Sequence, residues 1–300
     1  MINLYEELLN ILPTECVMCN EPMCKHTTFK VGGEADYFVE TNNLSQLREL
    51  VILLNENNVK YFILGNGSNV IFTDDGYRGV VLHTRLGDTN VTIENNIITI
   101  SAGELLTDVA NIARDAGLTG MEFASGIPGT IGGAVAMNAG AFDGEMKDIV
   151  KSVKVINKHG KIIELDNREL DFNYRSSMLK FVEFIVIEVK LELKKGIKEE
   201  ISAKMEDFLA RRRDKQPLSI PSAGSTFKRP EGHFAGKLIM EAGLSGYSIG
   251  GASVSTKHCG FVVNENNASA KDVCDLINHI KEEVFAKSGV NLEPEVIIVY

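Results

Sequence analysis

Apolar residues recur at helical spacing in several stretches of the chain. Leu47, Leu50, Val51 and Leu54 share one helical face, and Ser45 precedes them as a predicted N-cap. Similar spacing of apolar residues predicts further helices. Gly117 marks the end of one of them, and the capping pair Ser269 and Asp272 marks the start of another. The predicted helices cover residues 45–57, 104–116, 235–242 and 270–287, with one more charged helix that ends near Asp214.

Alternating or continuous apolar runs predict strands between these helices. The predicted strands cover residues 61–64, 70–73, 150–157, 161–165, 184–193 and 295–300, with a hairpin over 91–100 that turns at Asn95-Asn96. Strands and helices mix without a steady β-α-β alternation, so the expected fold class is α+β rather than a doubly wound parallel sheet. Gln216-Pro217 marks a boundary, because proline ends the preceding helix. We therefore expect a large domain over residues 1–215 and a smaller one over 216–300.

The composition is that of a globular protein with an acidic surface. The chain has 300 residues, 44% of them hydrophobic, which gives ample material for about two cored domains. A formal net charge of −10 leaves no global basic field, so we expect no nucleic-acid partner. No apolar run approaches the roughly 20 residues that cross a bilayer, and no basic region of a signal peptide is present. We expect a cytoplasmic protein with no membrane partner and no obligate protein partner.

Three of the five cysteines lie close together and a histidine follows them: Cys16, Cys19, Cys24 and His26. An odd cysteine count in a chain of this size favours reduced thiols over a disulfide framework. A structural zinc site usually brings a second pair of ligands, whereas Cys259 and Cys274 are isolated. We therefore predict that no metal is bound, with a zinc or iron–sulfur site as the alternative.

Two glycine-rich loops are the strongest signals for ligand binding. They read Gly65-Asn66-Gly67-Ser68-Asn69 and Gly126-Ile127-Pro128-Gly129-Thr130-Ile131-Gly132-Gly133-Ala134. Glycine permits positive φ and close approach, so backbone N–H groups can converge on an anion, and the second loop enters a possible helix whose N-terminus is partly positive. Val70 replaces the third glycine of the dinucleotide fingerprint, and no Gly-Lys-Ser/Thr follows, which disfavours Rossmann and Walker sites. Two such loops predict a dinucleotide diphosphate, with tight turns as the alternative for either loop alone.

Six segments in register extend this interpretation. They are His26-Thr27-Thr28-Phe29-Lys30-Val31-Gly32-Gly33, residues 64–69, residues 126–140, Phe172-Asn173-Tyr174-Arg175-Ser176-Ser177, Ser222-Ala223-Gly224-Ser225-Thr226-Phe227-Lys228 and Leu292-Glu293-Pro294-Glu295-Val296. In this order they resemble the UDP-N-acetylenolpyruvoylglucosamine reductase family over nearly the whole chain. The loops resemble those of the FAD-binding fold of p-cresol methylhydroxylase and vanillyl-alcohol oxidase. The resemblance implies an FAD-binding domain of two lobes, about 1–80 and 81–215, followed by an α+β substrate-binding domain.

The resemblance also implies an activity. The family consists of FAD flavoproteins, oxidoreductases that take hydride from NADPH and reduce UDP-N-acetylglucosamine enolpyruvate to UDP-N-acetylmuramate, a peptidoglycan precursor. Such an enzyme serves cell wall biogenesis, and through it cell shape and division. After hydride reaches the terminal carbon of the enol ether, the adjacent carbon is carbanion-like. That carbon needs charge stabilisation and a proton.

Three residues match these needs by resemblance. Ser225, in a tight turn, is the implied proton donor, although a serine is an effective acid only in a dry, oriented site. Arg175 would clamp the substrate carboxylate with its guanidinium fork. Glu295 would lie on the terminal strand and polarise the enol carboxylate or relay its proton. Glu293 is the rival acid on the same strand face, but the family motif places the acid directly before valine. A turn serine and a surface arginine are the plain alternatives.

Further residues are candidates for the phosphates of the substrate or of NADPH: Tyr174, Lys215, Lys228 and Arg229. The arginines 211–213 either contribute or form a solvated helix face. The longer form of the family inserts a substrate-covering loop before the basic helix and often has asparagine where Arg229 stands here. Only residues 181–193 and one helix fill that interval, so this chain resembles the shorter form.

Two other functions stay open at this point. A flavoprotein oxidase of the same fold often tethers FAD covalently through histidine, cysteine or tyrosine, but neither loop contains a histidine or cysteine, so we expect non-covalent FAD. A nucleotide-binding sensor would keep the loops and lose the chemistry. The coexistence of Arg175, Ser225 and Glu295 argues against such a sensor.

Overall fold

The computed structural model describes residues 2–84 and 91–300. The chain forms two compact units, each built from segments that are far apart in the sequence. The first unit comprises residues 1–19, 37–65 and 79–210, and the second comprises residues 20–36, 66–78 and 211–300. The expected division at residue 216 and the two lobes of the larger part stay predictions.

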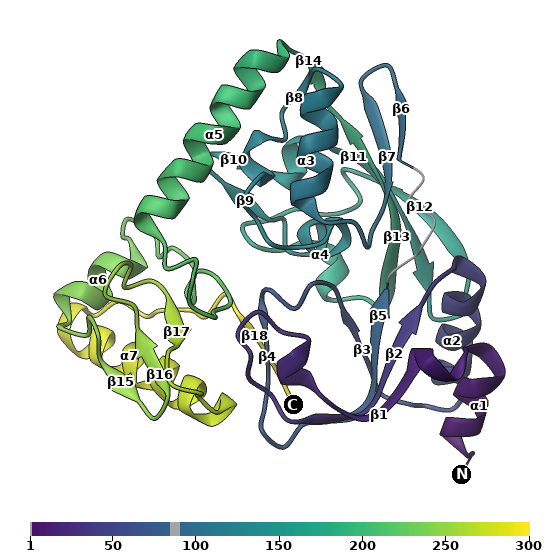
Figure 1. Cartoon of the computed structure of the whole chain (residues 1–300), viewed down its shortest axis with the longest axis horizontal. Coiled ribbons are helices and arrows are strands. Elements are labelled where there is room, and N and C mark those ends of the chain that lie inside the picture. Colours follow the sequence, from purple (N-terminus) through teal and green to yellow (C-terminus); the bar gives the residue numbers. More distant parts are fainter. Residues whose placement is uncertain (1, 85–90) are drawn as a thin grey trace. The chain divides into compact units, whose positions relative to one another are not determined.

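Helices and strands alternate irregularly along the chain (Figure 1). The helices are α1 (Leu4–Ile11), α2 (Leu44–Glu56), α3 (Leu106–Asp115), α4 (Ile131–Ala136), α5 (Lys198–Lys215), α6 (Ala235–Glu241) and α7 (Ala270–Ser288). The strands are β1 (Val17–Pro22), β2 (Glu34–Thr41), β3 (Tyr61–Leu64), β4 (Val70–Phe72), β5 (Tyr77–Thr84), β6 (Thr92–Glu94), β7 (Ile97–Ser101), β8 (Leu118–Thr119), β9 (Gly140–Ala141), β10 (Gly144–Glu145), β11 (Val150–Asn157), β12 (Ile162–Asp166), β13 (Phe184–Glu192), β14 (Lys194–Lys195), β15 (Ser248–Ile249), β16 (Ala252–Val254), β17 (Val262–Asn264) and β18 (Ile297–Val299). This mixture confirms the α+β class.

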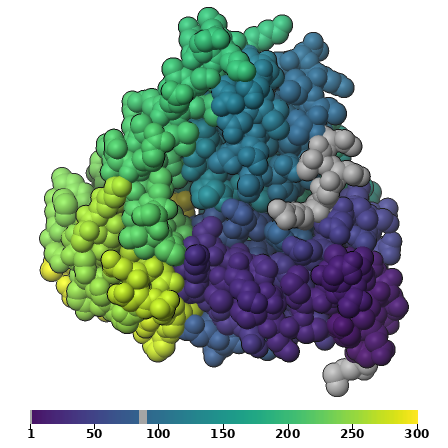
Figure 2. Space-filling model, in the orientation of Figure 1, coloured from purple at the N-terminus to yellow at the C-terminus, as the bar shows by residue number. Residues whose placement is uncertain are grey.

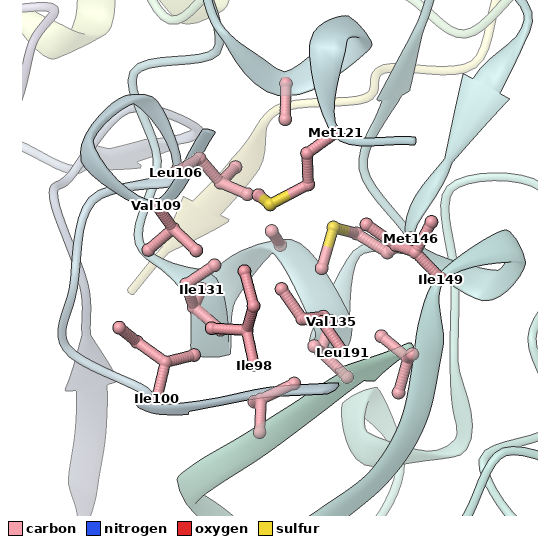
Figure 3. Packing of buried hydrophobic residues seen from close by; sticks show 14 of the residues in the cluster. Ile98, Ile100, Leu106, Val109, Met121, Ile131, Val135, Met146, Ile149 and Leu191 are labelled. Atoms are coloured by element: carbon pink, nitrogen blue, oxygen red, sulfur yellow. The ribbon is translucent and has the colours of Figure 1, made fainter. Parts of the chain in front are cut away.

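A five-stranded antiparallel sheet, in the order β12-β11-β13-β7-β6, supports the first unit. Helices α3 and α4 pack on one face of it, where Ile98, Leu106, Ile131 and Leu191 point toward one another (Figure 3). Helix α2 covers the opposite face with Leu47 and Val51, which contact Ile156, Ile185 and Ile187. The central strands of the sheet are therefore covered on both faces, and the site elements that follow α4 start from a rigid core.

A β-bulge in β13 allows its side chains to pack in the cores on both faces of the five-stranded sheet. In β13, Ile187 is an extra residue between the pairs Val186–Val155 and Glu188–Lys154. Ile185 and Ile187 face α2, whereas Val189 and Leu191 belong to the core under α3 and α4. An inserted residue breaks the two-residue side-chain period, so the face occupied by alternate residues changes there.

A four-stranded sheet, β1-β2-β5-β3, supplies a second core of the first unit. Strands β3 and β5 are parallel, and Val39, Val80 and Leu82 pack with residues of α1 and α2. The N-cap of α2 is Asn43, whose side-chain oxygen accepts from the Gln46 N–H at 3.0 Å. The predicted cap at Ser45 is wrong by two residues, because asparagine is equally suited and stands nearer the helix start.

The second unit packs α6 and α7 with the sheet β15-β16-β17 and with Phe29, Val31 and Ile71. The predicted capping box of α7 is confirmed, since Ser269 and Asp272 exchange side-chain and backbone bonds. Asp74 adds two bonds of 2.8 Å to the N–H groups of Ala270 and Lys271. Strand β18 pairs with β4 in parallel, so the C-terminus is fixed beside the strand that follows the first glycine loop.

Helix α5 carries charged residues along most of its length. Residues 198–210 of this helix, green in Figure 2, adjoin teal residues of the first unit. Phe208 stacks on Phe142 with ring centroids 4.2 Å apart. Only Ile201 and Met205 of this helix are buried. None of the helices in the described residues is long and apolar enough to span a membrane.

Candidate active site

The start of the first glycine loop lies against the second loop within the first unit. A Cβ on Gly65 would stand 2.5 Å from Thr130 Oγ1. Thr130 is the N-cap of α4, and its hydroxyl accepts from the Gly133 N–H at 3.3 Å. Any side chain at Gly65 would displace this cap, so the packing of the two loops requires glycine. The structure thus brings Gly65 and Thr130 together, as two loops around one ligand require.

The second loop is held by backbone bonds to residues 102–106. Leu106 N–H donates to the Gly129 carbonyl at 2.9 Å, and Ile131 N–H donates to the Glu104 carbonyl at 2.8 Å. The Gly132 N–H donates to the Ala102 carbonyl at 2.8 Å. A Cβ on Gly132 would collide with the Cβ of Ala102. The first-turn N–H groups of α4 are therefore engaged within the protein. A ligand phosphate would be met by N–H groups earlier in the loop, within residues 126–130.

In the second unit, the rest of the first loop packs on the motif that begins at His26. Gly67 has φ +61°, and a Cβ there would overlap the His26 carbonyl. Thr28 N–H donates to the Gly67 carbonyl at 3.1 Å, and the Thr28 hydroxyl donates to the Ser222 carbonyl at 2.7 Å. Thr28 therefore links the first loop to the segment that carries Ser225.

Ser225 and Glu295 lie on two short backbone segments that pair with each other. Glu295 N–H donates to the Thr226 carbonyl at 2.8 Å, and Lys228 N–H donates to the Glu293 carbonyl at 2.9 Å. Asn69 of the first loop donates from its amide to the Glu295 carbonyl at 3.2 Å. The peptide of Glu295 thus stands between the glycine loop and the serine segment.

The placement of Glu295 differs from the expected strand. Strand β18 begins at Ile297, so Glu295 and Glu293 precede it and pair with residues 226–228 instead. The sequence pattern predicted a longer strand because Val296 and the residues after it are apolar, but Pro294 and this separate pairing end the regular ladder.

Thr226 anchors the serine segment. Its side chain is buried, and its hydroxyl accepts from the Val262 N–H at 2.9 Å. Phe227 is buried beside it, whereas Ser225 is exposed after Gly224, which has φ +75°. The backbone therefore fixes the position of Ser225 while its hydroxyl stays accessible to a ligand.

Arg175 belongs to the first unit and sits in a tight turn with φ +55°. Asn173 and Ser176 close this turn through two backbone bonds. Arg175 Nη2 donates to the Gly140 carbonyl of β9 at 2.8 Å. Its guanidinium carbon is 5.1 Å from the ring centroid of the exposed Tyr174. The structure therefore brings Arg175 and Tyr174 to the small-residue segment after α4.

The sequence did not single out Asn138, which is fully buried beside this turn. Its amide donates to the Asn173 carbonyl at 3.0 Å and to Glu145 Oε2 at 2.7 Å. Its side-chain oxygen accepts from the Lys147 N–H at 2.9 Å. Asn138 lies in the segment 126–140, and an amide at the end of its small-residue run is the signal that could have marked it.

Glu122 is a second residue that the sequence analysis missed. Its side chain is only 3% exposed, and it stands four residues before Gly126, where the second loop begins. Burial alone raises the pKa of Glu122, but bonds from the Thr119 hydroxyl and the Gly120 N–H, with Lys204 nearby, hold that pKa below its ordinary value. Glu122 thus stays an anion that fixes the approach to the loop.

The candidate phosphate-binding residues have different surroundings. Lys228 forms an ion pair with Glu293, and the guanidinium of Arg229 lies 4.1 Å from the Phe234 ring centroid. Lys215 is exposed at the end of α5. Of the arginines 211–213, Arg211 and Arg213 are exposed and Arg212 is half-buried, and burial lowers the pKa of Arg212.

The clustered cysteines differ in exposure: Cys16 is buried, Cys24 is half-buried and Cys19 is exposed, all as free thiols. Cys16 accepts from the Asn42 amide at 3.5 Å, and His26 Nε2 is 3.0 Å from Glu21. Within residues 2–84 and 91–300 no group of three or more potential ligand side chains is arranged to hold a metal.

Two family profiles match the chain. The description of one is "UDP-N-acetylenolpyruvoylglucosamine reductase, C-terminal domain", and it matches residues 216–299. The other, "FAD binding domain", matches residues 35–166. The first match includes Ser225, Glu293 and Glu295, and the second includes both glycine loops.

Curated relatives are similar over nearly the full length. UDP-N-acetylenolpyruvoylglucosamine reductase of Lachnoclostridium phytofermentans is 49% identical over 298 residues, which cover 98% of this chain and 96% of the relative. The enzyme of the same name from Clostridioides difficile is 50% identical over 99% of this chain and 97% of its own length.

Solved structures show the same similarity. The crystal structure of UDP-N-acetylenolpyruvylglucosamine reductase from Thermus caldophilus has a TM-score of 0.81 at 35% identity, covering 93% of this chain and 98% of that one. A variant of Phl p 4, a glucose oxidase, has a TM-score of 0.52 at 14% identity over 66% of this chain and 45% of its own. The second match shows a shared fold alone.

Proposed function

Because this chain belongs to the UDP-N-acetylenolpyruvoylglucosamine reductase family, we propose that it reduces UDP-N-acetylglucosamine enolpyruvate to UDP-N-acetylmuramate, with FAD as cofactor and NADPH as hydride donor. It is an FAD-dependent oxidoreductase that acts in peptidoglycan precursor synthesis. Its substrate is a nucleotide sugar. When bound, FAD supplies hydride transfer from NADPH to the enol ether.

The residues of the two loops fit a dinucleotide. Those proposed to hold FAD are Gly65, Asn66, Gly67, Ser68, Asn69, Gly126, Gly129, Thr130, Gly132, Gly133 and Ala134. The contact of Gly65 with Thr130 and the absence of side chains at the glycines leave the backbone approachable, as a diphosphate requires. The N–H groups of Gly132, Gly133 and Ala134 already bond within the protein, so these three residues would contribute through close packing rather than as phosphate donors. Neither loop contains a histidine or cysteine for a covalent tether. FAD released into the supernatant by acid precipitation would support non-covalent binding, and colour retained in the pellet would contradict it.

The carbanion-like carbon needs charge stabilisation and a proton. Arg175 clamps the substrate carboxylate, because its guanidinium stays charged and binds a carboxylate bidentately. Ser225 donates the proton to the carbon next to that carboxylate, and Glu295 polarises the carboxylate or relays its proton. Ser225 is exposed in the absence of ligand, and exclusion of water by bound substrate would make proton donation by its hydroxyl feasible.

One observation carries the assignment of Ser225 and Glu295. The Glu295 peptide donates to Thr226, next to Ser225, and accepts from Asn69 of the first glycine loop. A cofactor on that loop and a proton donor on the serine segment therefore share one backbone support. This arrangement fits hydride transfer and proton transfer to neighbouring carbons.

The phosphates of the substrate need cationic or hydroxyl partners. We assign them to Lys228, Arg229, Tyr174 and Lys215. Lys228 already neutralises Glu293, whose side chain is 69% exposed and free to turn away when a phosphate arrives. We infer that the enzyme works in the cytoplasm without membrane or obligate protein partners. Its net charge of −10 disfavours a nucleic-acid partner.

An anaerobic two-step experiment tests this function. NADPH should bleach the flavin absorbance of the purified protein, and UDP-N-acetylglucosamine enolpyruvate should restore it with formation of UDP-N-acetylmuramate. Glucose and lactate serve as controls for an oxidase of the same fold. Bleaching by either control, or no reoxidation by the enolpyruvyl compound, would contradict the proposal.

A further inference from the structure

We propose that Asn138 is a positioning residue for Arg175, and this inference rests on the proposed role of Arg175 as the carboxylate clamp. Arg175 has a long side chain with many rotamers, so a clamp needs support for both its backbone and its guanidinium. Asn138 lies at the point where the two supports meet.

The first support acts on the backbone. The Asn138 amide donates to the Asn173 carbonyl at 3.0 Å, and Asn173 closes the turn in which Arg175 has φ +55°. Ser177 fixes the other side of this turn, because its buried hydroxyl donates to the Ala136 carbonyl at 2.9 Å. The turn is therefore attached on both sides to the segment that leaves α4.

The second support acts on the guanidinium. Arg175 Nη2 donates to the Gly140 carbonyl in β9, and Gly140 pairs with Glu145 of β10. The Asn138 amide also donates to Glu145 Oε2 at 2.7 Å. One side chain thus bonds the turn that carries Arg175 and the hairpin that receives its guanidinium.

Burial makes this arrangement specific. Asn138 has no exposed surface, and its oxygen accepts from the Lys147 N–H. In such a site, a displaced amide would leave several polar groups unpaired, which is costly. The hairpin itself is fixed at its turn by the stacking of Phe142 on Phe208. The amide therefore selects one relative placement of turn and hairpin, and with it one direction of the guanidinium.

The test uses Asn138→Gly, because glycine accepts the φ of +43° at this position and removes only the side chain. FAD content and the rate of flavin reduction by NADPH should stay within about twofold. The second step, reoxidation by the enolpyruvyl substrate, should slow by roughly 10- to 100-fold, because a displacement of about 1 Å in a clamp costs this much. Stopped-flow flavin absorbance measures each step.

Asn167→Ala is the matched control. The Asn167 amide donates to the Lys147 and Val150 carbonyls at 2.9 and 2.7 Å. It therefore supports the backbone of Lys147, as Asn138 does, without reaching residues 173–176. This variant should lose thermal stability but leave both steps within about twofold of wild type. An equal slowing of the second step in both variants would show that general loosening, not positioning, is the cause.

Arg175→Lys separates this inference from the proposed function. If Arg175→Lys slows reoxidation and Asn138→Gly does not, only the positioning role is overturned. If Arg175→Lys leaves reoxidation unchanged, the clamp itself is wrong. If Asn138→Gly does not accumulate as a flavoprotein, Asn138→Asp tests the inference instead. Aspartate keeps an oxygen that accepts from the Lys147 N–H, but it places a second oxygen, which cannot donate, toward Asn173 and Glu145. Normal reoxidation in Asn138→Asp would overturn the inference.

Discussion

Arg175 and Ser225 are supported in opposite ways. Arg175 depends on a buried side-chain amide, that of Asn138, which joins its turn to the β9–β10 hairpin. Ser225 depends on backbone pairing, with Thr226 and Phe227 buried beneath it and Glu295 bonded to the next peptide. One group is held by polar side chains and the other by main chain.

The difference follows from the side chains themselves. A guanidinium at the end of a long, flexible stem needs fixed acceptors, whereas a serine hydroxyl is one rotatable bond from the backbone. The Arg175 region should therefore be sensitive to substitutions at residues that never contact substrate. The Ser225 region should be sensitive mainly at Ser225 and at the acid beside it.

The largest expected effect is that of Ser225→Ala. Positioned proton transfer is worth about 10²- to 10⁴-fold, or roughly 3–5 kcal/mol of barrier. The second step should slow by that factor, while FAD binding and reduction by NADPH stay near wild type, because backbone pairing keeps the segment in place without the hydroxyl. Single-turnover flavin absorbance measures the two steps separately.

Ser225→Cys is the companion variant. A thiol at nearly the same place can still donate a proton, so part of the lost rate should return. Equal slowing of both steps in Ser225→Ala would mean that the serine supports the loop or the flavin. The role as proton donor would then be withdrawn.

The next largest effect should distinguish two carboxylates on one short segment. Glu295→Gln is expected to slow the second step by about 10²-fold, because it removes the acid beside the serine segment. Glu293→Gln should change the second step less than about threefold and alter mainly the KM for substrate, since Glu293 pairs with Lys228. A reversed order would move the acid role to Glu293. Steady-state and single-turnover rates for both variants provide the measurement.

Much of the fold could be predicted from local patterns. The hairpin turn at Asn95-Asn96, strand β11 and the capping box of α7 are confirmed, because each depends on residues close together in the sequence. The cap of α2 and the start of β18 were wrong. The start of β18 differs because residues 226–228, which are distant in the sequence, pair with residues 293–295. The local periodicity of a sequence carries no information on such long-range pairing.

The candidate site divides in the same way. Glycine loops and the residues Arg175, Ser225 and Glu295 stand in motifs, so sequence resemblance reaches them. Asn138 also lies in the segment 126–140, but its role, like that of Glu122, depends on bonds to groups whose positions exist only in the folded chain. A buried amide or carboxylate has no sequence signature apart from an unexpected polar residue among small or apolar neighbours.

A smaller effect, on stability, tests whether the region of the second loop depends on buried polar groups. The pKa of Glu122 lies below its ordinary 4.5 in the folded protein, so its stabilising contribution is present above the unfolded pKa and is lost as pH falls through the folded pKa. At pH 7, Glu122→Gln should lower the free energy of unfolding by about 1–3 kcal/mol. The difference from wild type should shrink as the pH falls below 4.5.

Glu164→Gln is the control for this measurement. Bonds from Lys190 and Ser152 also lower the pKa of Glu164, but its side chain is 46% exposed. Exposed ion pairs contribute about 0–1 kcal/mol, so this variant should change stability far less. Denaturant unfolding of both variants at several pH values compares them. Equal losses, or a Glu122 difference independent of pH, would contradict the role of the buried charge.

The smallest expected effect concerns the segment before the His26 motif. Replacing Cys16, Cys19 and Cys24 with serine should leave activity within a few-fold, because the first loop is held there by Thr28 and the His26 backbone, not by thiols. A modest loss of stability is expected from Cys16, which is buried, since a hydroxyl in its place costs desolvation.

A thiolate metal site would behave differently, because structural zinc supplies folding free energy that disappears with its ligands. Metal analysis of the wild type and unfolding of the triple variant therefore decide the matter together. Stoichiometric zinc in the wild type, with an unfolded variant, would show that this segment is held by a metal and that backbone support of the first loop is insufficient.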